Sequence, residues 1–137
     1  MAGGRPAGEP GGTLRPDQRL GRSRRLTRPS DFRATYEQGR RWIGRNMVLW
    51  LRSGEGASLR LGVVTSRKVG GSVQRSRARR LLREAYRRNR HRLAGAYDVV
   101  LVARRAILEA KWDEIVAELL ELAGEAGLVS GTLNAEH

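Results

Sequence analysis

The chain has 137 residues, of which 27 are Lys or Arg and 14 are Asp or Glu, so its formal net charge is +13 and its pI is about 11.6. This length suits one domain, and so basic a balance points to nucleic acid as the leading partner and an anionic membrane surface as the second. The sequence contains no cysteine and only two histidines, which excludes disulfides and thiolate sites and argues against a histidine metal centre. It has no apolar run near the ~20 residues of a membrane span and no secretory signal pattern, so a soluble, cytoplasmic protein is expected.

The basic residues are concentrated in the N-terminal two thirds. Residues 1–97 carry 24 basic and 6 acidic side chains, whereas residues 98–137 carry 3 and 8. The first part is therefore expected to face a polyanion, and the second to serve packing and solubility. The Gly- and Pro-rich residues 1–19 are predicted to be a disordered tail, 20–125 a single domain and 126–137 a disordered C-terminal tail.

In chain order, the first predicted element is a helix that begins at Pro29 or Ser30 and ends at Gln38, with Ser30 able to serve as its N-cap and Gly39 as its stop. Phe32 and Tyr36 are four residues apart, so both rings are expected on one side of this helix.

Two strands are predicted next. Residues 41–54 form the first, densest in apolar side chains at Met47–Leu51, and residues 57–66 form the second after the turn signal SGEG. A hairpin is expected to join them. The glycine-containing segment 67–73 is predicted as a loop.

The stretch 74–92 carries nine arginines and a single acid, Glu84. Like charges at i+3 and i+4 repel one another, so an outside partner is expected to neutralise them. A helical projection places five apolar residues within one arc (Ala78, Leu81, Leu82, Ala85, Leu93) and a polar set opposite (Ser76, Arg80, Arg83, Arg87). The stretch is therefore predicted to be a docked helix with a basic outer face. That face is almost purely arginine, which suits the phosphates and shape of folded RNA better than base reading in DNA.

The run Val99–Val102 predicts a buried central strand, and a closing helix follows with apolar residues at helical spacing (Trp112, Ile115, Val116, Leu119, Leu122 or Ala123). Its acidic side chains are interpreted as a solvated face. The element order is then α-β-β-α-β-α, and the helix between the second and third strands is a crossover, which favours a parallel pair.

Aromatic residues near arginines form another candidate site: Phe32, Tyr36 and Trp50, with Arg45 and Arg52 beside the last. Core packing and stacking of single-stranded nucleic acid are equally open explanations. The segment TSRKVGGS (65–72) is compatible with a phosphate-binding nest or with a plain turn. No residue set for catalysis by the protein is recognised, so another molecule would supply any chemistry.

Four motifs, in order, resemble the protein subunit of bacterial ribonuclease P over about Arg22 to Gly127. They are R-R-L (24–26) with D-F (31–32), R-L-G-V-V-T-S-R-K-V-G (60–70), V-Q-R-S-R-A-R-R-L-L-R-E-A-Y-R (73–87) and D-V-V-L-V-A-R (98–104). The family's Arg-Asn-Arg core corresponds to Arg75-Ser76-Arg77, where serine replaces asparagine.

The resemblance implies an α/β (α+β) two-layer sandwich with one sheet and a βαβ crossover that is left-handed, against the usual rule. It implies a subunit of a ribonucleoprotein endoribonuclease that removes the 5′ leader of precursor tRNA, with catalysis by the RNA subunit and a requirement for Mg²⁺ there. The implied partners are ribonuclease P RNA and precursor tRNA, with neither DNA nor membrane.

The resemblance also assigns binding residues by position. RNA-subunit contacts are expected at Arg75, Ser76, Arg77, Arg79, Arg80, Arg83 and Arg87. Leader contacts are expected at Phe32, Tyr36, Trp50, Ser66, Arg67 and Lys68, with further basic contacts at Arg25 and Arg45. The main alternative is an RNA-binding module without an attached enzyme, such as a ribosomal-type protein or an RNA chaperone, and a DNA-binding regulator is a third reading.

Overall fold

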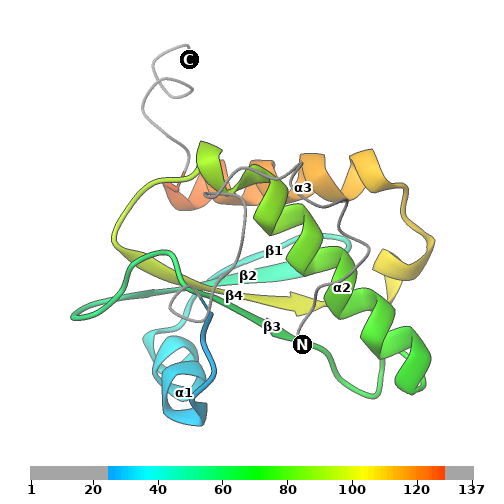
Figure 1. The fold of residues 1–137 in the computed structure, drawn as a ribbon, viewed down its shortest axis with the longest axis horizontal. Coiled ribbons are helices and arrows are strands. Elements are labelled where there is room, and N and C mark those ends of the chain that lie inside the picture. The colour runs from blue at the N-terminus through cyan, green and yellow to red at the C-terminus, as the bar shows by residue number, and fades with distance from the viewer. Residues whose placement is uncertain (1–24, 129–137) are drawn as a thin grey trace, which may run out of the picture.

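The computed structural model describes residues 25–128, and in it the apolar run 99–102 lies inside a mixed four-stranded sheet with helices on both faces (Figure 1). The sheet order is β1-β2-β4-β3; β2 is antiparallel to β1 and β4, and β3 is parallel to β4. The helices and strands are α1 (Pro29–Gln38), β1 (Arg40–Ile43), β2 (Met47–Ser53), β3 (Leu61–Val64), α2 (Ser72–Asn89), β4 (Tyr97–Ala103) and α3 (Trp112–Ala126), with short 3-10 turns at Arg90–Arg92 and Arg105–Glu109.

The predicted hairpin between 41–54 and 57–66 is wrong. The first of these segments is itself two strands, β1 and β2, and β4 lies between β2 and β3. Gly44-Arg45-Asn46 interrupts the segment because its turn-forming residues let the Gly44 N–H donate to the Met47 carbonyl at 2.8 Å. The observed order is α-β-β-β-α-β-α. The parallel crossover pair, β3 with β4, is confirmed, and the left-handed sense of the crossover stays a prediction.

The second predicted strand is also shorter than expected, because residues 58–60 bend around a carboxylate. The backbone N–H groups of Ser58 and Arg60 both donate to Asp98 Oδ1 at 3.1 Å. Leu59 between them has a φ of 61°, unusual for a residue with a side chain, and the Tyr86 hydroxyl donates to its carbonyl at 2.9 Å. Regular β structure therefore begins only at Leu61.

One face of the sheet is the hydrophobic core. The predicted apolar stripe of α2 is confirmed, since Ala78, Leu82 and Ala85 are completely buried there and Leu81 packs against their edge. Residues of α3 and the strands complete this core (Ile115, Leu119, Leu122, Leu49, Leu51, Val99, Leu101). Figure 1 shows α2 and α3 together on this face and α1 alone on the other.

Helix α1 has the predicted bounds but not the predicted cap. Its N-cap is Arg28, without a side-chain hydrogen bond, and Pro29 occupies the first helical position, where its fixed φ and missing N–H fit a helix start. Ser30 is therefore inside the helix. The stop at Gly39 is confirmed, with a φ of 69°.

The interpretation of the acids on the last helix as a solvated face is wrong for Glu118. Its carboxylate accepts hydrogen bonds from the Asn46 and Met47 backbone N–H groups and from Asn46 Nδ2, at 2.8–3.2 Å. A Cβ at Gly44 would lie 2.1 Å from Glu118 Oε2, so a side chain there would push the Glu118 carboxylate out of its present position. Glu118 thus fixes the β1–β2 turn.

The structured part of the chain extends beyond the predicted domain end at residue 125. Ala126 is buried, Gly127 ends α3 with a φ of 85°, and Leu128 is fully buried and donates its N–H to the Ala123 carbonyl at 2.8 Å. The predicted C-terminal tail therefore begins too early. The predicted N-terminal tail over 1–19 lies outside the described residues.

Candidate nucleic-acid interface

The face of the sheet opposite the core is covered only in part. The strand register places Arg41, Trp50, Val100 and Gly62 in one row from β1 to β3, and the rings of α1 pack on this row. The next row, Ile43, Val48, Val102 and Val64, is apolar and partly exposed, with Ile43 57% exposed. An aliphatic floor therefore lies open beside the aromatic side of α1.

Phe32 is seated on Gly62 of β3. A Cβ at Gly62 would lie 2.5 and 2.7 Å from two carbons of the Phe32 ring, closer than any real side chain allows. Glycine at this point lets the ring rest directly on the strand backbone. Phe32 therefore lies against the sheet face opposite the core.

Tyr36, Trp50 and Arg41 form a stacked series next to Phe32. The Tyr36 and Trp50 ring centroids are 5.0 Å apart with an edge-to-face angle of 79°, and the Arg41 guanidinium lies 5.4 Å from the Trp50 ring. Burial raises the pKa of the Tyr36 hydroxyl, although 37% of the residue remains exposed. The Phe32 and Tyr36 rings are therefore packed against the sheet, and Tyr36 remains partly accessible to a ligand.

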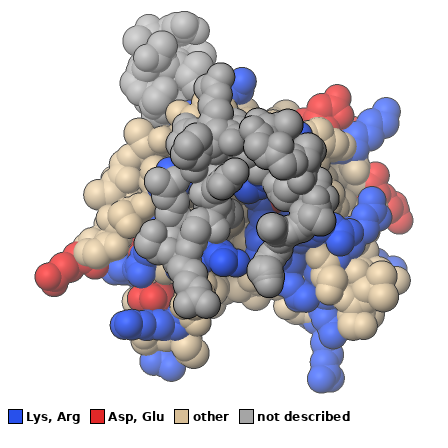
Figure 2. Space-filling model, viewed as in Figure 1, with Lys and Arg blue, Asp and Glu red and all other residues tan. Residues whose placement is uncertain are grey.

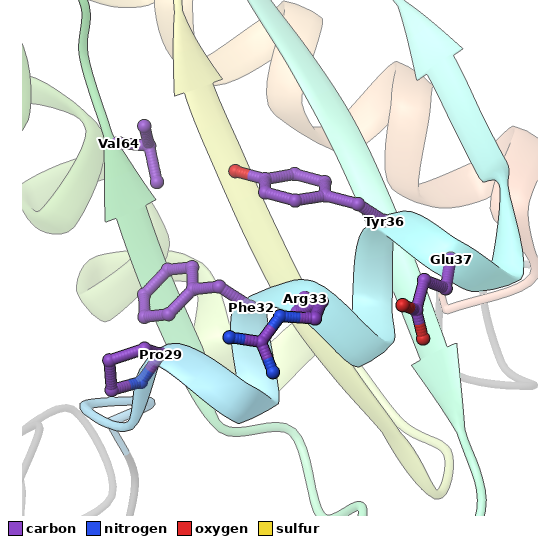
Figure 3. Close-up of a pocket in the computed structure, with 6 residues that line it drawn as sticks. All are labelled: Pro29, Phe32, Arg33, Tyr36, Glu37 and Val64. Atoms are coloured by element: carbon purple, nitrogen blue, oxygen red, sulfur yellow. The ribbon is translucent and has the colours of Figure 1, made fainter.

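These side chains border an open pocket of about 570 Å³ (Figure 3). Six residues line it: Pro29, Phe32, Arg33, Tyr36, Glu37 and Val64. Figure 3 shows the Phe32 and Tyr36 rings extending from α1 toward the strand that carries Val64. The lining combines two aromatic rings with one cation, Arg33, and one acid, Glu37. Aromatic rings with cations nearby are typical of sites for single-stranded nucleic acid.

A buried carboxylate stabilises the other end of the same sheet face. Asp98 is fully buried and accepts from Arg60 Nη2 at 2.7 Å and Arg52 Nη2 at 3.1 Å, while Arg60 also lies 3.8 Å from Asp31 of α1. Burial acts to raise the pKa of Asp98, but the hydrogen bonds from Arg60 and the Ser58 backbone outweigh it and lower the pKa. Arg52, which the sequence placed beside Trp50 as a nucleic-acid contact, is instead bound within the protein.

The loop after β3 presents the predicted rim residues. Ser66, Arg67 and Lys68 are exposed, directly beyond Val64 of the pocket. The loop amides are used internally, since Lys68 N–H donates to Ser66 Oγ, Val69 N–H to the Ser66 carbonyl and Gly70 N–H to the Arg67 carbonyl. This favours a plain turn over a phosphate-binding nest, and leaves the side chains to contact a ligand.

The outer face of α2 is basic, as predicted. Ser76, Arg77, Arg80 and Arg83 are exposed. Figure 2 shows basic side chains on this side of the molecule, where the residues that are not described leave it in view. Three arginines make contacts within the helix region: Arg75 Nη1 donates to the Gly70 carbonyl at 2.9 Å, Arg77 Nη1 to the Leu108 carbonyl at 3.3 Å and Arg79 Nη2 to Ser76 Oγ at 3.2 Å. Each retains further N–H groups for an RNA phosphate.

The expectation that Arg87 lies on the exposed face is wrong. The residue is only 8% exposed and its guanidinium pairs with Glu84 one turn earlier, which draws it onto the helix surface. Glu84 also binds Arg88 Nε at 3.0 Å. The single acid of α2 is therefore committed to the last turns. Between residues 25 and 128, Arg79, Arg80 and Arg83 have no acidic partner.

The two remaining basic residues lie at different places. Arg25 forms an isolated parallel bridge with Leu61 at the free edge of β3. Partial burial of the Arg83 side chain, together with the charges of Arg79 and Arg25, lowers the pKa of Arg83, so Arg25 is close enough to α2 to add to its positive charge. Arg45 is exposed in the β1–β2 turn that Glu118 holds. The structure does not bring Arg45 together with Arg25.

The residues of this site that the sequence analysis missed include Arg33, Arg41, Gly62 and Val64. The signal for Arg41 is its register opposite Trp50, which requires the β1–β2 turn to be recognised first. Within residues 25–128, no group of three or more His, Cys, Asp or Glu could hold a metal ion, and no helix is long and apolar enough to cross a membrane.

Comparison with known proteins gives one consistent family. The family described as Ribonuclease P matches residues 20–127. The ribonuclease P protein component of Alkaliphilus metalliredigens is 34% identical over 106 residues, covering 77% of this chain and 96% of that protein. The component from Chloroflexus aurantiacus is 36% identical over 114 residues, covering 82% and 84%.

Solved structures agree. The RNase P protein from Thermotoga maritima shares 27% identity with a TM-score of 0.65, covering 72% of this chain and 94% of that one. The RNase P protein from Staphylococcus aureus, at 23% identity, has a TM-score of 0.68 over 78% of this chain and 98% of that one, a likeness in fold.

Proposed function

Because the chain belongs to the protein-subunit family of bacterial ribonuclease P, we propose that its two candidate RNA surfaces have separate ligands. As a member, it is the protein subunit of a ribonucleoprotein endoribonuclease that acts in tRNA 5′ processing, and its partner is ribonuclease P RNA. We assign the basic face of α2 to that RNA and the pocket between α1 and the sheet to the 5′ leader of precursor tRNA.

The leader assignment is supported by the aromatic side of α1. Phe32 and Tyr36 offer ring faces and edges beside an open aliphatic row, and Arg33, Arg41, Arg67 and Lys68 supply positive charge around it. Stacking tolerates any base, because every base has a π-face. Such a site suits a leader, whose sequence differs from one tRNA to the next.

The RNA-subunit assignment is supported by arginines of α2 that have no acidic partner within residues 25–128. Arg80 and Arg83 project from a helix that is anchored on its other side by Ala78 and Leu82. Arginine binds phosphate through a planar fork of donors, so a rigid row of them suits folded RNA. Ser76 replaces the family's asparagine and receives a hydrogen bond from Arg79.

The two surfaces lie on opposite faces of the sheet, joined by the loop 65–71 (Figure 1). A protein placed between the two RNAs lowers their mutual repulsion, which favours binding of both substrate and Mg²⁺ at the RNA active site. The Mg²⁺ ions would be held by RNA phosphates and would activate water and stabilise the leaving oxygen. We also propose a cytoplasmic location, because precursor tRNA is made there.

The observation that carries this proposal is the contact of the Phe32 ring with Gly62. It places an aromatic ring on the sheet face opposite α2. Phe32→Ala should weaken holoenzyme binding of leader-bearing tRNA several-fold while leaving mature tRNA binding and RNA-subunit affinity unchanged. The double variant Arg80→Ala/Arg83→Ala should do the reverse and lower the salt dependence of RNA-subunit binding. Loss of RNA-subunit affinity in Phe32→Ala would show that Phe32 belongs to the core.

A further inference from the structure

At the junction between α1 and β1, a side-chain amide takes the place of the next backbone hydrogen-bonded pair of the β1–β2 ladder. Gln38 ends α1, and its Nε2 donates to the Ser53 carbonyl at 2.8 Å while its Oε1 accepts from the Ser53 N–H at 2.9 Å. The β1–β2 ladder includes the pair Arg40↔Leu51, so the next equivalent pair would be residue 38 with residue 53. The amide of Gln38 thus continues the ladder after the backbone has turned into the helix.

The backbone at this junction is also fixed. Gly39 has a φ of 69°, in the left-handed region that favours glycine, and its N–H donates to the Tyr36 carbonyl at 3.0 Å. One residue therefore lies between the end of the helix and the first residue of the strand. The Gln38–Ser53 pair therefore ties the last residue of α1 to the last residue of β2 and restricts the angle between the helix and the sheet.

The direction of α1 decides where its rings lie. Phe32 is six residues from Gln38, about 9 Å along the helix, so a tilt of about 10° at the junction would displace it by about 1.6 Å. That displacement would lift the ring from its seat on Gly62. At the other end, α1 is tied to the sheet by the Asp31–Arg60 ion pair, which is long at 3.8 Å and partly exposed.

We propose that Gln38 is a positioning residue for the leader site. Both ends of its amide are engaged by Ser53, so it acts through the placement of Phe32 and Tyr36. This inference rests on the proposed function of the pocket. The inference adds that leader binding depends on a residue outside the pocket, since Gln38 is not among the residues that line it.

The test compares Gln38→Ala with Ser30→Ala, a change at an exposed residue near the start of the same helix whose side chain makes no hydrogen bond within residues 25–128. For each holoenzyme, the dissociation constants for leader-bearing and mature tRNA are measured, together with RNA-subunit affinity and the rate at saturating substrate. Gln38→Ala should lower the preference for leader-bearing tRNA about five- to tenfold, as expected for two exposed hydrogen bonds at the low end of the usual net contribution. The saturated rate and RNA-subunit affinity should stay unchanged, and Ser30→Ala should match the wild type.

A second variant, Gln38→Glu, keeps the acceptor but places a carboxylate oxygen against the Ser53 carbonyl, and should be no better than alanine. Equal preferences in Gln38→Ala and Ser30→Ala would overturn the inference. An equal fall in RNA-subunit affinity would also overturn it, because Gln38 would then support the fold as a whole. Phe32→Ala distinguishes a failure of this inference from a failure of the proposed function. If neither Phe32→Ala nor Gln38→Ala changes the preference for leader-bearing tRNA, the pocket is not the leader site. If only Phe32→Ala changes it, the pocket assignment stands and the role of Gln38 is refuted.

Discussion

Gly62→Ala is the smallest change that should disturb the proposed leader pocket while keeping all the side chains that line it. Gly62 is buried under Phe32, and its backbone is outside the left-handed region, so an alanine is tolerated by the chain itself. The new Cβ would lie 2.5 Å from the Phe32 ring and 3.3 Å from Leu26 Cβ. The ring must therefore move outward by about 1 Å to reach an ordinary contact of ~3.5 Å.

The magnitude follows from stacking. A base stacked on an aromatic side chain contributes about 1–3 kcal/mol, and a ring displaced by about 1 Å should lose part of that, about 1 kcal/mol. Binding of leader-bearing tRNA should weaken about fivefold. The free energy of unfolding should fall by only about 1 kcal/mol, because overpacking is offset in part by the reduced entropy of the unfolded chain.

The assay is a double-mutant cycle on holoenzyme affinity for leader-bearing tRNA. Gly62→Ala is introduced into the wild type and into Phe32→Ala, where the ring is absent and the Cβ has room. The effect should be about fivefold in the first background and near zero in the second. A loss of the same size in both backgrounds would refute the seat of Phe32 on Gly62 as the cause.

Three further predictions concern stability. The pKa of Asp98 is lowered in the folded protein, so Asp98 stabilises the fold above the ordinary aspartate pKa near 3.8, and this stabilisation is lost as the pH falls below that value. Asp98→Asn should therefore reduce the fall in the free energy of urea unfolding between pH 6 and pH 2. An unchanged pH dependence would contradict the stabilisation of the Asp98 carboxylate by Arg60. Tyr86→Phe removes the donor to the Leu59 carbonyl and should lower the free energy of urea unfolding by about 1–2 kcal/mol, whereas no change would mean that water replaces the hydroxyl. Glu118→Ala leaves the amides of the β1–β2 turn without their acceptor and should lower the unfolding free energy by about 2–3 kcal/mol, seen as a lower Tm; a wild-type Tm would show that the turn is stable without it.

Much of the fold is readable from local patterns. The bounds of α1 follow from Pro29 and Gly39, the docking face of α2 from its apolar spacing, and the central strand from four consecutive apolar residues. These features depend on residues close in sequence, where propensity and periodicity are informative.

The errors come from partners far apart in the chain. The β1–β2 turn is specified by Glu118, 72 residues after Asn46, and the bend at 58–60 by Asp98, 38 residues after Arg60. Neither carboxylate carries a local signal, so the first two predicted strands were paired with each other although β4 separates them. Arg87 was misplaced for a different, local reason, because a helical projection does not account for the ion pair with Glu84, three residues earlier, that holds the Arg87 side chain against the helix.

The candidate site divides in the same way. The sequence identifies aromatic and basic residues, but whether Phe32 is core or surface depends on its contact with Gly62, thirty residues on, and on the open row beside it. No sequence motif marks Gln38 as a functional residue, and its pairing with Ser53 depends on the register between β1 and β2.

The most direct test of the central claim, that the leader lies between α1 and the sheet, is site-specific crosslinking in the assembled holoenzyme. Precursor tRNA carrying a single 4-thiouridine at successive leader positions is irradiated, and the crosslinked residues are mapped by mass spectrometry. At least one leader position should crosslink to Phe32, Tyr36 or the β3–α2 loop, and none to the outer face of α2. Leader crosslinks confined to Arg80, Arg83 and their neighbours on α2 would contradict the account.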